Sequence, residues 1–232
     1  IILPDRPGSH GPRWCTIPFG MDLEKFLDRL ASAEPSPGGG AAAALTGALA
    51  AGLFAKACNL TLGRERFREV EADVRRLLDQ AEALRRRLVD LMAADAEAYG
   101  QVAAAYRLPR TAEAEKEARS EAIEAALKRA TEVPLEVARA CRDLLRLGPE
   151  VAAKTNPALR SDVALGGALA RAAAHGVRFN IQDNLANIKD QEFKTQVWAE
   201  LAYLLAECDF LFNDLGRAMP EYEMKVPPTP KA

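Results

Sequence analysis

Apolar side chains recur at helical spacing over one long stretch of this chain. Apart from one interval of eight residues, neighbouring members of the series are separated by three or four residues, a spacing that places them on one face of an α-helix. The series comprises Val70, Val74, Leu77, Ala81, Leu84, Leu88, Leu91, Tyr99, Val102 and Tyr106. It predicts a long amphipathic helix over residues 64–107.

One position on this apolar face is occupied by an acid. Asp95 falls between Leu91 and Tyr99, where the spacing calls for an apolar side chain. Burying a carboxylate costs free energy, and burial alone can raise its pKa by as much as ~3–5 units. Asp95 is therefore a candidate for proton transfer. The alternative is structural, because a carboxylate inside a helical bundle can instead pair with a buried arginine or cap a neighbouring helix.

The rest of the sequence predicts further helices, over residues 21–34, 38–63, 111–147, 161–188 and 191–219. Their ends are predicted at residues that stop or terminate helices, namely Pro35, Gly63, Pro109 and Gly148. Helix starts are predicted at residues that favour the N-cap position, namely Thr111 and either Ser161 or Asp162.

A proline lies inside one of the predicted helices. Pro134 has no N–H group to donate to the carbonyl four residues earlier. The carbonyl oxygen of Ala130 is therefore expected to be free for another partner.

These patterns predict an all-α fold, a helical bundle with long helices. No segment alternates with period two for long enough to form a convincing strand. We expect one domain over residues 21–219, an irregular N-terminal arm over 1–20 and a loose C-terminal tail over 220–232; whether residues 1–20 belong to the natural protein stays open. The apolar surface of the helices at 38–63 and 64–107 is more than a few antiparallel helices can cover, which predicts a homodimer.

Charge argues against two classes of partner. The chain has 31 Lys and Arg against 33 Asp and Glu, a net charge of −2, so it has no general basic footprint for nucleic acid or an anionic membrane. Residues 38–55 carry no charge, but their alanines and glycines favour a buried helix over a membrane span.

Metal chemistry is not expected, since the four cysteines show no CxxC spacing and histidine is scarce. The residues concerned are Cys15, Cys58, Cys141, Cys208, His10 and His175. Reduced thiols and the lack of a secretory signal pattern predict a cytoplasmic location.

Two candidate polar groups lie at the ends of the helix predicted over residues 38–63, which is rich in alanine and glycine. At its start, the N–H groups of Gly38, Gly39 and Gly40 can meet an anion or a polar ring edge, although a tight turn explains the glycines equally well. Near its end lie Lys56 and Asn59. Lys56 can also be an ordinary surface side chain.

Two more polar groups belong to the helix predicted at 161–188 and the connector before it. Asn180, Asn184 and Asn187 share one helical face, which would either fix the register of a dimer or line a polar pocket. In the connector, Asn156 precedes Ser161 and Asp162, of which helix capping explains only one.

Five sequence blocks together resemble a known family. In order they are PSPGGGAAAALTGALAAGLFAKACNLTLGR, DAEAYGQVAAAYRLPR, ALKRATEVPLEVA, Asn156 with SDV, and FNIQDNLANIKDQEF. Their order and spacing resemble the cyclodeaminase domain of formimidoyltransferase-cyclodeaminase and its stand-alone relatives, which include the methenyltetrahydrofolate cyclohydrolases of the serine pathway. The resemblance covers residues 22–215.

The resemblance implies an all-helical dimer that acts on tetrahydrofolate carrying a one-carbon unit, with no further cofactor and no metal. It places the catalytic aspartate at Asp95. It suggests that Gly38, Gly39, Gly40, Asn59, Tyr106, Asn156, Asp162 and Asn184 hold the folate. Lys56 or Arg64 would meet the glutamate tail, whose preferred length stays open.

Three functional readings are open, of which the first two follow from this resemblance. A cyclodeaminase would convert 5-formimidoyltetrahydrofolate to 5,10-methenyltetrahydrofolate and release ammonia, and it is the favoured reading. A cyclohydrolase would open the methenyl bridge with water to give 10-formyltetrahydrofolate. The third reading is a non-catalytic helical dimer that binds folate or a partner protein.

Two features depart from the pattern of the family. Ala41 stands where relatives often carry serine, so a hydroxyl contact is missing there. No block in these 232 residues resembles a transferase, and a separate formimidoyltransferase as partner stays open.

Overall fold

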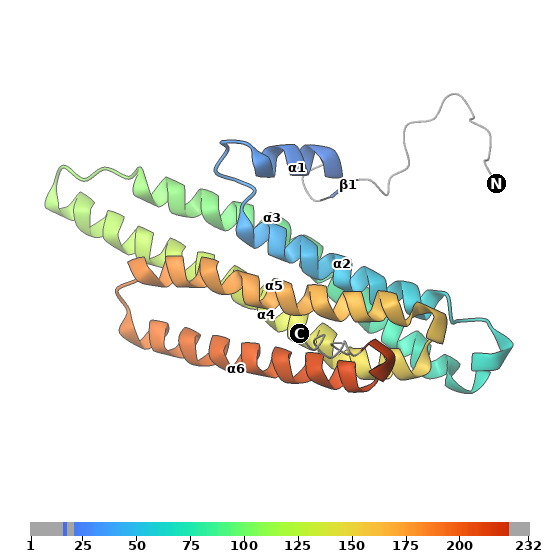
Figure 1. Ribbon diagram of the computed structural model, residues 1–232. Coiled ribbons are helices and arrows are strands. Elements are labelled where there is room, and N and C mark those ends of the chain that lie inside the picture. Colours follow the sequence, from blue (N-terminus) through green and yellow to red (C-terminus); the bar gives the residue numbers. More distant parts are fainter. Residues whose placement is uncertain (1–15, 18–20, 223–232) are drawn as a thin grey trace, which may run out of the picture.

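The computed structural model describes residues 16–17 and 21–222, and over this part of the chain the protein is almost entirely helical (Figure 1). The main elements are α1 (Leu23–Ala31), α2 (Gly39–Asn59), α3 (Glu71–Tyr106), α4 (Glu113–Lys154), α5 (Arg160–Asn187) and α6 (Gln191–Arg217). Two-residue strands, β1 (Thr16–Ile17) and β2 (Met21–Asp22), pair antiparallel before α1. The predicted all-α class is confirmed.

The ends of the predicted domain differ in detail from expectation. Most of the expected arm at 1–20 lies outside the described residues. The expected loose tail begins instead with a 3-10 turn, η4 (Pro220–Tyr222), where Glu221 accepts a 2.8 Å hydrogen bond from Arg160. The rest of that tail lies outside the described residues.

Several predicted helix boundaries were wrong, including the ends of α1 and α2, which lie at Ala31 and Asn59 rather than at residues 34 and 63. Residues 65–70 form a 3-10 helix, η2 (Glu65–Val70), so the long helix starts only at Glu71. The fourth helix does not stop at Gly148 but continues through Pro149 to Lys154. At its start the N-cap is Ala112 rather than Thr111, because the Glu115 carboxylate reaches back to accept both backbone N–H groups, of Thr111 and Ala112.

The start of α5 also differs from the predicted cap. A 3-10 turn, η3 (Pro157–Leu159), precedes the helix, and the Asn156 side chain caps it by accepting a 3.2 Å hydrogen bond from Ala158. Ser161 and Asp162 therefore lie inside the first turn of α5, not at its N-cap.

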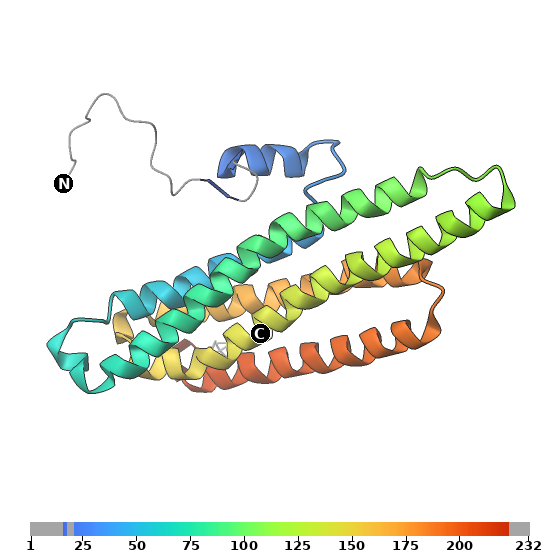
Figure 2. The same ribbon diagram turned by 180° about the vertical axis from the view of Figure 1, so that it is seen from behind.

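The five long helices run alongside one another, with α2 between α3 and α5 (Figures 1 and 2). Small residues allow this close packing. A Cβ on Gly47 would press against Leu88 and Cys141, and one on Gly166 would press against Phe54. α2 is long and apolar enough to cross a membrane by length and composition, a criterion that the core helix of a globular protein also meets.

The apolar face of α3 is buried in its first half and opens in its second. Val74, Leu77, Ala81 and Leu88 are fully buried. Beyond Asp95 the α3–α4 hairpin extends past the start of α2 (Figure 2), so that Tyr99 is 45% exposed. The predicted face thus changes from a core contact to the wall of a cavity.

Candidate active site

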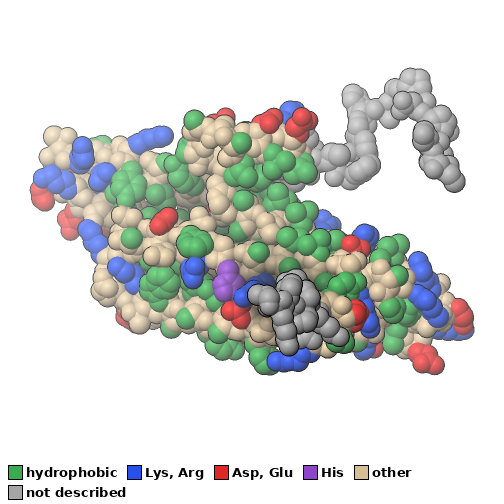
Figure 3. All heavy atoms as spheres, in the orientation of Figure 1, with side chains coloured by type: hydrophobic (Ala, Val, Ile, Leu, Met, Phe, Trp, Pro, Cys, Tyr) green, Lys and Arg blue, Asp and Glu red, His purple; other side chains and the backbone are tan. Residues whose placement is uncertain are grey.

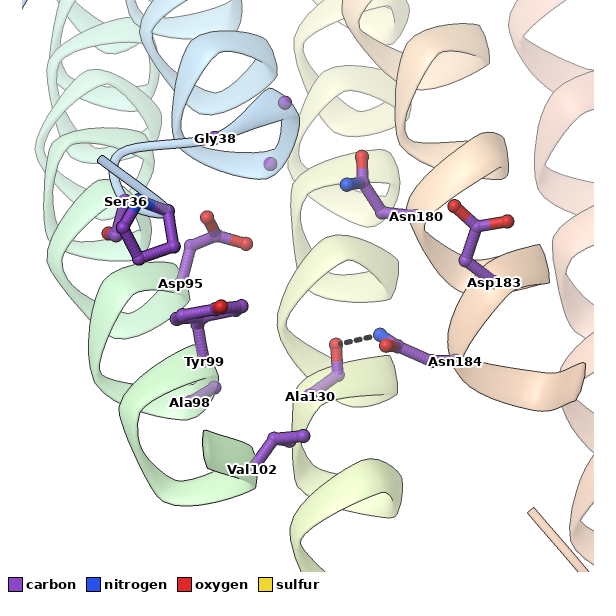
Figure 4. A pocket seen from close by; sticks show the side chains of 13 residues that line it. Ser36, Gly38, Asp95, Ala98, Tyr99, Val102, Ala130, Asn180, Asp183 and Asn184 are labelled. Atoms are coloured by element: carbon purple, nitrogen blue, oxygen red, sulfur yellow. Dashed lines mark hydrogen bonds between the residues drawn. The ribbon is translucent and has the colours of Figure 1, made fainter. Parts of the chain in front are cut away.

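A cavity of about 310 Å³ lies where α3, α4 and α5 surround the start of α2 (Figure 4). Its volume is at the lower end of the range for small-molecule sites. Its lining consists of Pro35, Ser36, Gly38, Gly39, Gly40, Asp95, Ala98, Tyr99, Val102, Ala130, Asn180, Asp183 and Asn184.

Asp95 projects from α3 toward the first turn of α2. Its Oδ2 accepts a 3.0 Å hydrogen bond from the backbone N–H of Ala41. At this end of a helix the N–H groups lack intrahelical partners, and the helix dipole favours negative charge. α2 therefore provides Asp95 with both a donor and a favourable field.

The carboxylate can approach this closely because residue 40 is glycine. A Cβ on Gly40 would collide with the carboxylate oxygens of Asp95. Gly39 faces the opposite wall, where a Cβ would touch the Asn180 amide at 3.4 Å. The approach of side chains to the backbone thus explains Gly39 and Gly40, whereas a Cβ on Gly38 would have open space.

Burial raises the pKa of Asp95 above its ordinary value of 3.8, and the hydrogen bond from Ala41 opposes this rise. Desolvation disfavours the ionised carboxylate, and no cation of the described residues lines the cavity to compensate. The direction of the shift agrees with the prediction from the sequence. A carboxylate whose pKa is raised is a stronger base than an ordinary carboxylate, and it can return the proton that it accepts.

Two amide side chains and one carboxyl group form the wall opposite Asp95. Asn180, Asp183 and Asn184 all lie on α5 and line the cavity (Figure 4). Asn184 Nδ2 donates a 2.9 Å hydrogen bond to the carbonyl of Ala130, the group that Pro134 was predicted to free. Of the two readings for the Asn face, the polar pocket is therefore realised at Asn180 and Asn184, whereas Asn187 is exposed and bonds to the Asp183 carbonyl.

A second polar cluster lies at the other end of α2. Lys56 pairs with Asp162 at 2.8 Å, and the Asn156 side chain accepts a 2.5 Å hydrogen bond from Arg66. α2 has 21 residues, so this cluster is about 30 Å from the start of the helix at 1.5 Å per residue. One chain does not bring these residues together with Asp95.

The remaining candidates also lie away from the cavity. Asn59 ends α2 and Arg64 follows it, both on the side of the second cluster. Tyr106 ends α3, half-exposed, with the Arg119 guanidinium 5.6 Å from its ring. Of the predicted site residues, those that line the cavity are Gly38, Gly39, Gly40, Asp95 and Asn184.

Among the described residues, the cysteines and His175 are separate from this cavity. Cys58, Cys141 and Cys208 are buried, and burial raises the pKa of the Cys58 thiol to about 11. His175 contacts Asp209 at 3.0 Å on the surface between α5 and α6. Within the described residues no group of three or more His, Cys, Asp or Glu side chains could hold a metal ion.

The sequence profile described as formiminotransferase-cyclodeaminase matches residues 22–203. The chain belongs to this family. The matched region contains every cavity residue, from Pro35 to Asn184. The resemblance noted from the five blocks is thereby confirmed.

Relatives in this family carry both of the enzyme names expected from the sequence. The chain is 42% identical to the methenyltetrahydrofolate cyclohydrolase of Methylorubrum extorquens over 82% of this chain and 91% of the relative. It is 32% identical to the formimidoyltransferase-cyclodeaminase of Sus scrofa, over 80% of this chain and 34% of that longer protein. The crystal structure of formiminotetrahydrofolate cyclodeaminase from Thermotoga maritima is similar, with a TM-score of 0.78 and 29% identity, and the match covers 87% of this chain and 96% of that one.

Sequence reasoning did not identify every residue that lines the cavity of this protein. Ser36 and Tyr99 line the cavity but were not proposed as site residues. Tyr99 lies one helical turn after Asp95 on the same face, so the spacing alone could have identified it. Ser36 comes from the segment between α1 and α2, where periodicity gives no information.

Proposed function

We propose that this protein is an enzyme that acts on the one-carbon unit between N5 and N10 of tetrahydrofolate. The observation that supports this best is the position of Asp95, a carboxyl group of raised pKa at a cavity with no lining cation among the described residues. The methenyl bridge is an amidinium cation. A cavity with the carboxyl groups of Asp95 and Asp183 in its wall favours such a ligand over an anion.

The first assignment is methenyltetrahydrofolate cyclohydrolase. Support comes from the 42% identity with a cyclohydrolase over nearly the full length of both chains. The formimidoyltransferase-cyclodeaminases match less closely, and this chain spans about a third of their length.

In the hydrolytic reaction Asp95 would move one proton twice. The oxygen of water forms a bond to the methenyl carbon, and the Asp95 carboxylate takes a proton from that water. The carbon–N5 bond then breaks while Asp95 returns the proton to N5, and the proton of the new hydroxyl leaves to solvent. The products are 10-formyltetrahydrofolate and one proton, and proton transfer of this kind contributes about 10²–10⁴ in rate.

The second assignment is formimidoyltetrahydrofolate cyclodeaminase, supported by the structural likeness to the Thermotoga maritima enzyme. N10 would form a bond to the carbon of the protonated formimidoyl group. Asp95 would carry the proton of N10 to the departing nitrogen, ammonia would leave, and the methenyl cation would remain. Both reactions pass through a tetrahedral carbon between two nitrogens. The same residues could therefore serve the opening of the bridge by water and its closure with loss of ammonia.

Neither reaction changes an oxidation state, so tetrahydrofolate as the carrier of the one-carbon unit suffices and no further cofactor or metal is included in the proposal. Gly38, Gly39, Gly40 and Asn184 are proposed to bind the pterin part. A cytoplasmic location, without a membrane or nucleic-acid partner, completes the proposal.

We further propose that the protein is a homodimer. Leu49 on α2 and Leu165 and Phe179 on α5 are 55%, 51% and 59% exposed. The two helices run side by side, and hydrophobic side chains gather over them on the face shown in Figure 3. A second copy would remove this apolar surface from water.

The second polar cluster can contact a substrate bound at Asp95 only if that substrate is long, or if a second copy of the chain brings the cluster close. Lys56, Asn59, Arg64, Asn156 and Asp162 are about 30 Å along α2 from Asp95. They and Tyr106 are kept as proposed substrate-binding residues, meeting either an extended glutamate tail or the substrate of a second copy.

The absorbance of the methenyl band tests the assignment. Purified protein is given 5,10-methenyltetrahydrofolate or 5-formimidoyltetrahydrofolate at neutral pH, with spontaneous conversion subtracted. Accelerated loss of the band identifies a cyclohydrolase, and growth of the band with release of ammonia identifies a cyclodeaminase. No change in either assay would contradict both and favour the non-catalytic reading.

A further inference from the structure

Two prolines lie inside α4, and only one of them frees a carbonyl that reaches the cavity. Pro134 cannot donate to the carbonyl of Ala130, and Pro149 cannot donate to that of Leu145. Ala130 lines the cavity, whereas Leu145 is buried in the core. Pro134 therefore differs from Pro149 in what it leaves available to a ligand site.

The freed carbonyl is used by a side chain of the opposite helix. Asn184 Nδ2 donates to the Ala130 oxygen at 2.9 Å, and both residues line the cavity (Figure 4). A carbonyl oxygen can only accept, so the nitrogen of the amide must face it. This contact fixes the orientation of the Asn184 amide, which is otherwise nearly free to turn over.

A fixed amide presents a defined group to a ligand. With Nδ2 bonded to Ala130, the amide keeps its Oδ1 for another donor, and none of the hydrogen bonds among the described residues occupies that oxygen. The pterin edge of a folate carries N–H groups that can donate to such an acceptor. An amide turned the other way would place its own N–H groups there and would leave two donors facing one another.

We propose that Pro134 is a positioning residue, which frees the Ala130 carbonyl so that it holds Asn184 with its oxygen available to accept from an N–H group of the pterin. This inference rests on the proposed function for the identity of the ligand. It assigns a binding role to a proline that does not itself line the cavity.

The Pro134→Ala variant removes the residue that frees the Ala130 carbonyl and keeps Asn184 unchanged. Alanine restores an N–H group that competes for the Ala130 carbonyl in the ordinary helical manner, and it removes the ring that keeps this carbonyl from its helical bond. Pro149→Ala is the matched control, since it makes the same backbone change in the same helix away from the cavity.

The first readout needs no ligand. A crystal structure of Pro134→Ala is expected to have the N–H of residue 134 bonded to Ala130 and the Asn184 amide turned away from it. An unchanged bond between Asn184 and Ala130 would overturn the inference, whatever the protein catalyses.

The second readout is the dissociation constant for tetrahydrofolate, measured anaerobically by calorimetry on the full chain. Asn184→Ala is expected to raise it about tenfold, Pro134→Ala by about three- to tenfold, and Pro149→Ala by less than about twofold. Because Pro134 acts through Asn184, the double variant should bind no more weakly than Asn184→Ala alone.

A purely structural role for Pro134 gives a different pattern. The effect of Pro134→Ala would then persist in full in the Asn184→Ala background, or it would be matched by Pro149→Ala, and either result would overturn the inference. Wild-type protein that fails to bind tetrahydrofolate would instead contradict the proposed function and the ligand assigned here, while the crystal structure of the variant would still test the contact.

Discussion

At the scale of single residues, the site depends on the Asp95 carboxyl group, which the fold partly desolvates and which no cation of the described cavity lining compensates. α3 places Asp95 where its spacing calls for an apolar side chain, and the first turn of α2 meets it with the Ala41 N–H. A Leu or Ala there would avoid the cost of a buried polar group. A position that costs stability in this way is typical of an active site.

Gly40 permits the contact between Asp95 and α2, and its replacement should disturb that contact. In Gly40→Ala the new Cβ collides with the Asp95 carboxylate. We expect a loss of stability of about 1–3 kcal/mol and at least a tenfold lower turnover. The measurements are chemical denaturation and the methenyl assay.

Gly100→Ala is the control for that variant. Gly100 lies on the same helix as Asp95, outside the cavity lining, and its Cβ would have open space. Alanine there should stabilise α3 by about 0.5–1 kcal/mol and leave turnover unchanged. Equal turnover in both variants would show that Gly40 does not position Asp95.

The raised pKa of Asp95 predicts a pH dependence of stability. The folded protein holds this proton more tightly than the unfolded chain does, so the stabilisation is complete below the ordinary pKa of 3.8. It is lost as the pH rises through the raised pKa of the folded state. Asn does not titrate, so the free energy of unfolding of the wild type relative to Asp95→Asn should fall as the pH rises from about 4, and then level off.

Chemical denaturation of both proteins at a series of pH values measures this difference. A wild type that gains stability relative to Asp95→Asn over the same range would mean that the pKa is lowered, not raised.

At the scale of the helices, sequence spacing predicted most of the architecture but not every boundary. The six helices, the position of Asp95 and the freed carbonyl of Ala130 follow from local patterns. The passage of α4 through Pro149 does not, because tertiary packing of residues such as Leu145 and Val151 overrides the local preference to stop. The hydrogen bond from Asn184 to the Ala130 carbonyl could not be predicted either, because it depends on how α4 and α5 pack.

The hydrogen bond between Thr61, just after α2, and Asn156, in the connector before α5, can be tested at this scale. The buried Thr61 hydroxyl donates to the Ala57 carbonyl and accepts a 2.8 Å hydrogen bond from the Asn156 backbone N–H. Thr61→Val preserves shape but leaves that N–H without its partner. We expect a loss of about 1–3 kcal/mol in the free energy of unfolding.

Thr131→Val is the matched control for this hydrogen bond. Thr131 is equally buried, but its hydroxyl bonds only to the Leu127 carbonyl of its own helix. Its replacement should cost clearly less than that of Thr61. Similar losses in the two variants would mean that the contact between Thr61 and Asn156 contributes little.

At the scale of the whole molecule, the bundle places an acidic cavity at one end of α2 and a mixed-charge cluster at the other, with an apolar face of α2 and α5 between them. Sequence reasoning grouped the candidates of both ends into one site, because family blocks do not report distance along a bundle. The proposed homodimer is one arrangement in which both ends would serve one substrate, and an extended glutamate tail is the other.

Light scattering tests the dimer. The wild type should have about twice the 25.1 kDa mass of one chain at micromolar concentration, and Leu49→Glu should lower it toward 25.1 kDa by placing charge on the apolar face. Leu108→Glu, at the exposed tip of the α3–α4 hairpin, should leave the mass unchanged. A monomeric wild type would refute the proposed dimer.

The most direct test of the account is the turnover of Asp95→Asn in the methenyl assay, with tetrahydrofolate binding measured on the same preparation. Asn can still accept the hydrogen bond from Ala41 but cannot move a proton. We expect turnover to fall by about 10²-fold or more while the dissociation constant changes only a few-fold. Full turnover in this variant would contradict the role assigned to Asp95.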